Sequence, residues 1–123
     1  ASYGDLSGKR IGQSMDTVYF EPYDADRGLI KVTLTDEAQI LRLLSIGRIA
    51  VAVGTSPNID WDIRRLGYSG SFERAEYEPP VVTDLFFGVS RKSAAMSLAD
   101  DLERALVDLA AEGTLEGIAK KYQ

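Results

Sequence analysis

The chain has 123 residues, a formal net charge of -5 at pH 7, and neither cysteine nor histidine. These two absences exclude disulfides, thiolate nucleophiles, Ser-His-Asp triads and zinc sites with nitrogen or sulfur ligands. Because an acidic surface repels phosphate backbones, we expect no nucleic-acid partner.

The first two predicted elements are β-strands. Residues 9–14 ("KRIGQS") follow a turn at Ser7-Gly8 and alternate in polarity, as a short strand does. Residues 29–35 ("LIKVTLT") are rich in β-branched side chains, which favour strands. Two strands near the start of the chain therefore provide the beginning of a sheet.

A helix, a buried strand and a second helix are expected next. We expect Thr35 to cap the first helix and Gly47 to end it. Its buried stripe would consist of Ile40, Leu41, Leu43 and Leu44. Residues 48–53 ("RIAVAV") are almost entirely apolar, which is typical of a strand buried on both faces of an α/β sheet. Residues 59–66 predict a short helix.

The last third of the chain predicts one strand and two helices. Residues 81–90 ("VVTDLFFGVS") form an apolar strand region after Pro79-Pro80. Gly113 should end the first helix and Thr114 should cap the last. The two helical faces comprise Leu98, Leu102, Ala105, Leu106 and Leu109, then Leu115, Ile118, Ala119 and Tyr122. The order of elements predicts an α/β fold with a mostly parallel sheet flanked by helices.

Four stretches carry a resemblance to a known family. They are "DLSGKRIG" (5–12), "ILRLLSIGRIAVAV" (40–53), "LFFGVSRKS" (85–93) and "LADDLERALVDLAAEGTLEGIAKKY" (98–122). In this order they resemble the second lobe and the C-terminal segment of bacterial extracellular solute-binding proteins of family 3. These are periplasmic binding proteins with a Venus-flytrap fold.

The resemblance implies a division of the chain and a function. Residues 1–80 would form the second-lobe α/β domain, and residues 81–123 the return strand and the terminal helix pair that normally belong to the first lobe. The N-terminal portion of that first lobe has no counterpart in the sequence. The chain would be a periplasmic or extracellular receptor component, without its signal peptide. It would bind a small polar molecule for the membrane permease of an ABC-type importer, without a cofactor.

Two positions depart from the family pattern. Ala50-Val51 stands where the family usually has Asp-Ala, and Thr55 is the closest match for an aspartate that holds the ligand's α-ammonium group in amino-acid receptors. The family's Gly-Thr-Thr-like turn, which holds the ligand carboxylate, is "SMDTVY" (14–19) here. Asp16 lies where an anion should sit, although Thr17 keeps one hydroxyl. These departures argue against a free α-amino acid as the ligand.

The candidate ligand-binding residues follow two predicted strands. Ser14, Asp16 and Thr17 follow the first strand, and Thr55 and Ser56 follow the most buried one. Loops at the carboxyl ends of strands in an α/β sheet are where ligands bind. Their alternative role is structural, because hydroxyls and carboxylates at these positions also cap helices and close turns.

Aromatic residues and acidic pairs each allow two interpretations. An aromatic wall for a ligand, or core packing, would involve Trp61, Tyr19, Phe20 and Tyr23. The acidic pairs Asp60/Asp62 and Asp100-Asp101 are typical of solvated helix starts, and we expect no metal.

Binding without catalysis is the preferred interpretation of the function. A carboxylate-based, dehydratase-like lyase on the same fold would need an acid/base pair such as Asp16 with Glu21 or Asp24. The spacing singles out no such pair. A periplasmic sensor domain of a signalling protein is a further alternative that this segment of sequence does not distinguish from a transport receptor.

The apolar helical ending predicts self-association. In the resembling family the terminal helices pack on the first lobe, so here they need another surface. The predicted strand at 81–90 has no pairing partner, and the helix pair after it has no surface to pack on. This combination favours exchange of the whole segment between protomers. We therefore expect a symmetric homodimer, domain-swapped through the residues after Pro80, in which residues 81–123 form most of the interface.

Overall fold

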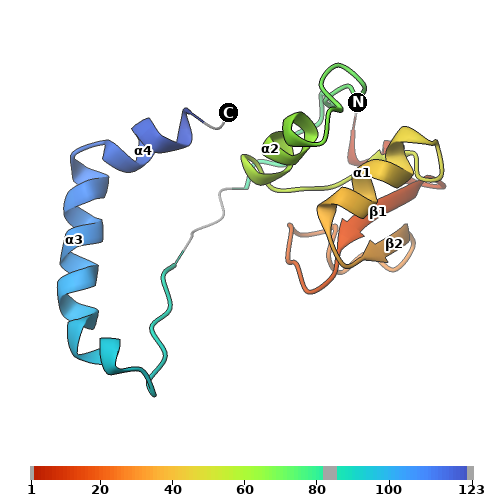
Figure 1. The fold of residues 1–123 in the computed structure, drawn as a ribbon. Coiled ribbons are helices and arrows are strands. Elements are labelled where there is room, and N and C mark those ends of the chain that lie inside the picture. The colour runs from red at the N-terminus through yellow and green to blue at the C-terminus, as the bar shows by residue number, and fades with distance from the viewer. Residues whose placement is uncertain (1, 82–85, 122–123) are drawn as a thin grey trace. The chain divides into compact units, whose positions relative to one another are not determined.

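The computed structural model describes residues 2–81 and 86–121, which fall in two units, Ala1–Val81 and Val82–Gln123 (Figure 1). Each unit has its own secondary structure and is described separately. The interpretation of residues 1–80 and 81–123 as parts of two lobes stays a prediction.

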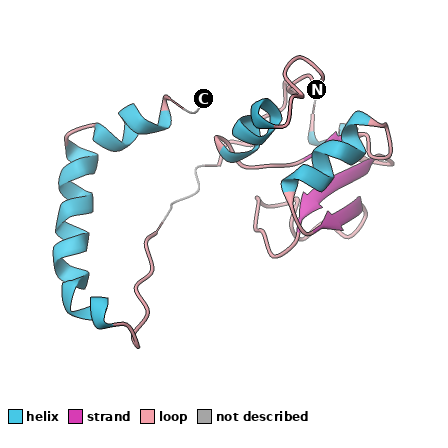
Figure 2. Cartoon of the chain, in the orientation of Figure 1, coloured by secondary structure: helices cyan, strands magenta, loops and turns pink. Residues whose placement is uncertain are grey.

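The first unit contains a three-stranded parallel sheet. The chain starts with the short 3₁₀-helix η1 (Tyr3–Leu6) and continues into β1 (Arg10–Ser14), β2 (Ile30–Leu34) and β3 (Val51–Ala52). The strand order is β2-β1-β3, with both pairs parallel. Together with the helices of the chain, this sheet confirms the predicted α/β class with a parallel sheet (Figure 2).

The strand predicted at residues 48–53 is shorter than expected. Only Val51 and Ala52 form β3, and Val51 to Val53 are partly rather than fully buried. The backbone N–H groups of Arg48 and Ile49 donate to the carbonyl of Leu43, at 2.9 and 3.4 Å. These amides close the preceding helix and are not available to the sheet, which is why the strand begins late.

Helix α1 (Glu37–Ser45) connects β2 to β3 and packs on one face of the sheet. Asp36, and not Thr35 as predicted, caps it, since the Asp36 carboxylate accepts the Gln39 N–H at 2.8 Å. Asp36 has the extended backbone conformation that a cap requires. Gly47 follows the helix with φ 69°, a left-handed conformation that favours glycine, so the predicted helix end is confirmed.

The two faces of β1 bury different partners. Gly12 faces α1, where a Cβ atom would lie 2.9 Å from Ile40 Cγ2 and closer still to Ile49 Cδ1. The neighbouring Ile11 is 1% exposed and packs with Phe20 and Tyr23. Because successive residues of a strand point to opposite faces, β1 supplies both cores of this unit.

Helix α2 (Asn58–Arg65) follows β3, and residues 66–81 complete the first unit. The helix agrees with the prediction for residues 59–66. Beyond it, Tyr77 packs against Tyr3 and Phe20, with ring centroids 6.4 and 6.5 Å away. The last segment of this unit therefore returns to its beginning.

The second unit is helical. It contains η2 (Ala94–Leu98), α3 (Ala99–Ala111) and α4 (Thr114–Ala119). Gly113 has φ 74° and is the N-cap of α4, so the prediction that Thr114 caps this helix is wrong. Thr114 is instead the first helical residue. Gly113 adopts the left-handed conformation at the junction without strain.

The strand predicted at residues 81–90 is absent where the structure describes this segment. Val81 and residues 86–90 are not in a strand, and residues 82–85 lie outside the described part of the chain. Phe86 and Phe87 are 88% and 79% exposed. A strand needs a hydrogen-bonded neighbour, and an apolar, β-prone sequence does not supply one. Tyr122, expected on the inner face of the last helix, also lies outside the described residues.

Candidate functional site

The candidate residues lie in two loops that leave neighbouring strands at the same edge of the sheet. Ser14 ends β1, and Thr55 and Ser56 come shortly after β3. The two strands are parallel, with Gly12 paired to Ala52, and Val53 N–H donates to the Gly12 carbonyl at 3.0 Å. Continued by two residues, the same register places residues 14 and 54 at the same height along the strand direction. Both loops therefore start from the carboxyl edge of the sheet.

The loop after β1 is braced by its own side chains. The Ser14 N–H donates to the Tyr19 hydroxyl at 2.9 Å, and the Tyr19 N–H donates to the Asp24 carboxylate at 2.9 Å. The Tyr23 hydroxyl donates to Gln13 Oε1 at 2.8 Å. Through Tyr19 and Tyr23, these bonds attach the loop to Ser14 and Gln13 at the end of β1. They limit the freedom of the loop to rearrange.

Lys31 on the neighbouring strand β2 also holds this loop, through hydrogen bonds and a cation–π contact. Its ammonium group donates to the carbonyls of Tyr23 (2.6 Å) and Asp24 (3.2 Å) and lies 4.5 Å from the centroid of the Tyr23 ring. A cation over an aromatic face gains attraction beyond its hydrogen bonds. The sequence interpretation missed this role. The available signal was a lysine between Ile30 and Val32 in a strand.

The tip of this loop is exposed and polar. Asp16 is exposed and has φ 54°, a left-handed conformation that aspartate tolerates better than most residues. The Thr17 hydroxyl, also exposed, donates to the Met15 carbonyl at 3.2 Å. Ser14, by contrast, is only partly exposed. Asp16 thus presents its carboxylate at the loop tip, while the hydroxyl proton of Thr17 is used within the turn.

The second loop leads directly into α2. The Thr55 carbonyl accepts the Ile59 N–H at 3.1 Å, and the Ser56 hydroxyl donates to the Asp60 carboxylate at 2.6 Å. Both side chains are exposed. Gly54 has no room for a larger residue, because a Cβ atom would lie 2.9 Å from Ile59 Cβ. Ser56 therefore takes part in the start of the helix, whereas the Thr55 hydroxyl lies on the surface of the edge.

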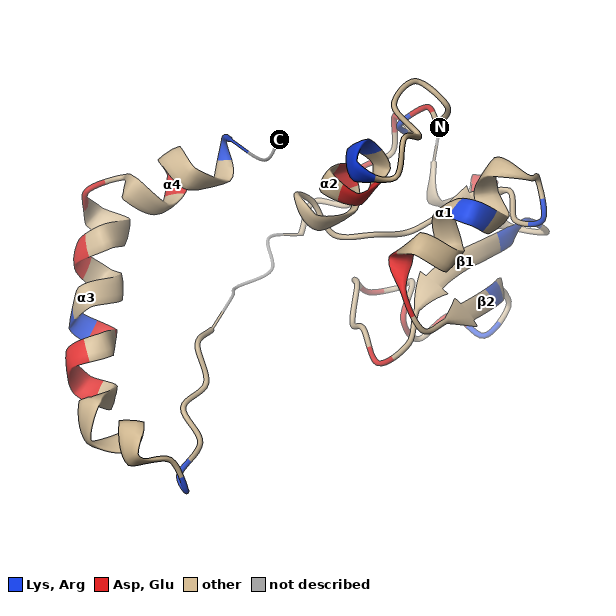
Figure 3. Cartoon of the chain, viewed as in Figure 1, with Lys and Arg blue, Asp and Glu red and all other residues tan. Residues whose placement is uncertain are grey.

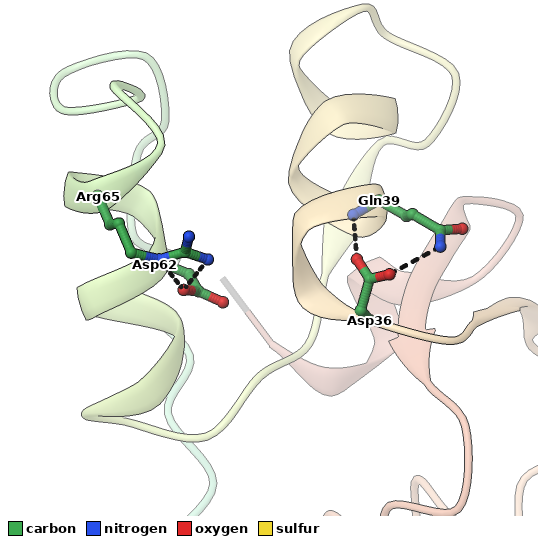
Figure 4. Close-up of polar contacts among 4 residues, drawn as sticks. All are labelled: Asp36, Gln39, Asp62 and Arg65. Carbon is green, nitrogen blue, oxygen red and sulfur yellow. Dashed lines mark hydrogen bonds and ion pairs between the residues drawn. The ribbon is translucent and has the colours of Figure 1, made fainter.

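In the first unit, acidic residues lie at the start of α1, on α2 and in the loop after β1, while lysine and arginine lie where β1 and β2 begin and in the last turn of α2 (Figure 3). At the start of α1, the backbone N–H of Gln39 holds the pKa of Asp36 below its usual range (Figure 4). Burial raises the pKa of Glu37, and the negative charge of Asp62 adds to this effect. Asp62 in turn accepts two hydrogen bonds from Arg65, at 3.0 and 2.9 Å.

Three of the four candidate aromatic residues belong to the core. Phe20 and Tyr23 are 9% and 1% exposed, and their rings stack with centroids 5.4 Å apart. Tyr19 packs against the same cluster and uses its hydroxyl on Ser14. Phe20 and Tyr23 are therefore too buried to form a ligand-facing wall, whereas Tyr19 is partly buried. Trp61, on α2, is 47% exposed.

The acidic pairs have local partners. On α3, Asp101 pairs with Arg104 at 2.6 Å, and Asp100 lies in the first turn of that helix. Across residues 2–81 and 86–121, no three acidic residues are grouped as metal ligands would be. Of the two carboxylates that could accompany Asp16 in an acid/base pair, Asp24 is committed to the Tyr19 backbone.

Comparisons with known proteins return no relative. No protein-family model matches the chain, and no match was found among curated proteins or among solved structures. None of the helices in the described part of the chain is both long and apolar enough to span a membrane.

Proposed function

We propose that this chain is a lobe of a solute-binding receptor of the Venus-flytrap type and binds a small polar molecule at the carboxyl edge of its sheet. One observation carries this proposal: the loops after β1 and β3 leave adjacent parallel strands at the same edge. Open α/β sheets bind ligands outside the carboxyl ends of their strands. The resemblance of four stretches of sequence to family 3 solute-binding proteins supports the receptor assignment.

The chemistry of the edge favours a ligand that donates hydrogen bonds. Asp16 offers a carboxylate, the exposed Thr17 hydroxyl can accept, and the exposed Thr55 hydroxyl can accept or donate. The bracing of the first loop by Tyr19, Tyr23 and Lys31 supports this role. A loop that is already ordered loses little conformational entropy when a ligand binds, so more of the contact energy appears as affinity.

The proposal places the chain in transport. A periplasmic or extracellular receptor of this type delivers its solute to the membrane permease of an ABC-type importer. The ligand would favour closure of two lobes by contacting the closed state better than the open one. The carboxyl edge described above is the surface that this lobe would contribute.

Heteronuclear NMR titration with sugars, polyols, polyamines and carboxylic acids tests the site. We expect shifts in residues 14–17 and 54–56 for the solute that binds. Thr55→Val keeps the shape of the side chain and removes its hydroxyl, which should weaken that binding by about 1–3 kcal/mol if its partner stays buried. Thr114→Val, in α4, is the matched control. Equal affinities for both variants and the parent would assign Thr55 to the loop alone.

Free α-amino acids should bind poorly, because Thr55 supplies no negative charge for an α-ammonium group and Asp16 repels an α-carboxylate. Isothermal calorimetry with the common amino acids tests this expectation. Micromolar binding of any of them would contradict this part of the proposal and leave the location of the site to be decided by the NMR shifts.

A further inference from the structure

The helices of the second unit carry an apolar surface that the described residues of their own unit do not cover. We define the α3 stripe as Leu98, Leu102, Ala105, Leu106 and Leu109, which recur at helical spacing on one face. Leu98 is 53% exposed and Leu102 45%. Among residues 86–121 no side chain is buried. A helix of this length is marginal in water without packing, so the stripe needs a partner.

The stripe has an acidic border. Asp101, Asp108 and Glu112 follow one another at helical spacings along one side of it. Between residues 99 and 119 the chain has six carboxylates, and Arg104 is the sole basic residue there. A surface that covers the stripe therefore has to be apolar with a positive rim.

Pairing of two α3 stripes with each other does not meet this requirement. In an antiparallel pair related by a twofold axis, the same border of each helix faces its copy. Asp108 and Glu112 would then face carboxylates of the partner, whereas Asp101 already pairs with Arg104 of its own helix. Like charges placed together at an interface are unfavourable, so a basic surface elsewhere on the molecule matches the stripe better than a second stripe in this arrangement.

The opposite end of the sheet in the first unit has the required chemistry. We define the amino edge as Arg10, Ile30, Arg42, Ile46 and Arg48. Arg10 is paired with Ile30 in the sheet, and the Ala50 N–H donates to the Arg10 carbonyl at 2.9 Å, which joins the chain after α1 to the start of β1. Ile30 and Ile46 are 49% and 60% exposed, and the three arginines are exposed as well.

The charge of this edge remains positive when the segments that directly precede β1 and β2 are included. Lys9 and Arg27 add two positive charges, because they directly precede β1 and the turn into β2. Asp5 and Asp26 are the carboxylates in these segments. Asp5 accepts the Ser2 N–H, and Asp26 accepts hydrogen bonds from the Tyr3 hydroxyl and the Gly28 N–H, both at 2.8 Å.

We propose that the α3 stripe of one copy docks on the amino edge of a second copy, and that the second copy reciprocates, giving a twofold-symmetric homodimer. The acidic border of the stripe complements the arginines of the amino edge. The leucines of the stripe pack against Ile30 and Ile46. Reciprocity forms this contact twice, so a twofold dimer buries twice the surface of a single docking event. Docking at the amino edge does not use the residues of the carboxyl edge.

Sedimentation equilibrium from low to high micromolar concentration tests the dimer. Leu102→Glu should raise the dimer dissociation constant at least about tenfold, because it places a charge in the centre of the contact. Val107→Glu is the matched control, since Val107 lies on the far side of α3 and is 62% exposed. The dimer dissociation constant of the Val107→Glu variant should stay within about twofold of that of the parent protein. A monomer at every concentration, or equal effects of the two variants, would overturn the proposal.

A second pair of variants tests the surface on which the stripe docks. Arg48→Glu should weaken the dimer about tenfold, and Asp108→Arg in the same chain should restore part of the loss. Arg74→Glu, which changes an exposed arginine elsewhere in the first unit, should have little effect. High salt should weaken the parent dimer by screening. A dimer indifferent to Arg48→Glu, or a monomer with protected α3 amides, would show that the stripe docks elsewhere or within one chain.

Discussion

The two units use apolar side chains differently. In the first unit Ile11, Ile40 and Leu41 are at most 1% exposed, whereas Leu98, Leu102 and Leu115 in the second unit are at least 40% exposed. Both sets recur with the spacing of buried faces. The difference is that the first unit packs helix α1 on a sheet, whereas the described residues of the second unit form helices without a sheet. Periodicity selects the face of an element, but burial requires a second layer.

The largest expected effect on stability comes from a substitution in the core of the first unit, which should not affect the second unit. Ile40→Ala should lower the free energy of unfolding by about 2–5 kcal/mol, because it leaves a cavity under α1. Leu102→Ala, in dilute monomer, should change the stability of the first unit by less than about 0.5 kcal/mol. Urea unfolding followed by the fluorescence of Trp61 reports on the first unit. Equal losses for both variants would mean that the two units share a core.

A pair of glycines sharpens the same comparison. Gly12→Ala should cost about 1–3 kcal/mol, because its methyl group would meet Ile40 and Ile49. Gly117→Ala meets nothing within 4 Å and should stabilise α4 by up to about 1 kcal/mol, since alanine favours helices. Thermal unfolding and far-ultraviolet circular dichroism measure the two effects. A tolerated Gly12→Ala would contradict the close packing of β1 against α1.

The smallest expected effect concerns pH. The folded state lowers the pKa of Asp36, so the ionised carboxylate stabilises the fold above the unfolded-state pKa. That contribution is lost as the pH falls below about 4 and through the folded-state pKa. Asp36→Asn keeps an acceptor for the Gln39 N–H but does not titrate, so its stability should fall less on acidification.

The control for the pH experiment lies in the other unit. Asp101→Asn removes an exposed carboxylate that pairs with Arg104 on α3, and it should leave the pH profile of the first unit unchanged. Denaturant unfolding at a series of acidic pH values gives both profiles. Identical profiles for the parent and Asp36→Asn would show that the cap does not depend on ionisation.

Local patterns predicted most of the elements of the first unit. β1, β2 and α1 lie within one or two residues of the predicted ranges, and Gly47 ends α1 as expected. Alternation, β-branching and helix-end glycines are properties of a few consecutive residues, so they can be recognised without the fold. The choice between Thr35 and Asp36 as the cap was wrong, because it depends on which of two adjacent polar residues takes the extended conformation.

The candidate site was predicted only in part. That residues 14–17 and 54–56 leave one edge follows from the parallel pairing of β1 and β3, which the α/β pattern anticipates. The bracing contacts were not predicted, since Ser14–Tyr19, Gln13–Tyr23 and Lys31–Tyr23 depend on side chains that meet only after folding.

The sequence by itself determined the chemistry and the local elements: a chain without cysteine or histidine, two early strands, and helices with one apolar face each. Only the tertiary structure decided which apolar faces are covered. It placed Phe20 and Tyr23 in a core, limited β3 to two residues and left residues 86–90 without a strand. The physical reason is that burial and strand pairing need partners distant in the chain, and no local pattern specifies those partners.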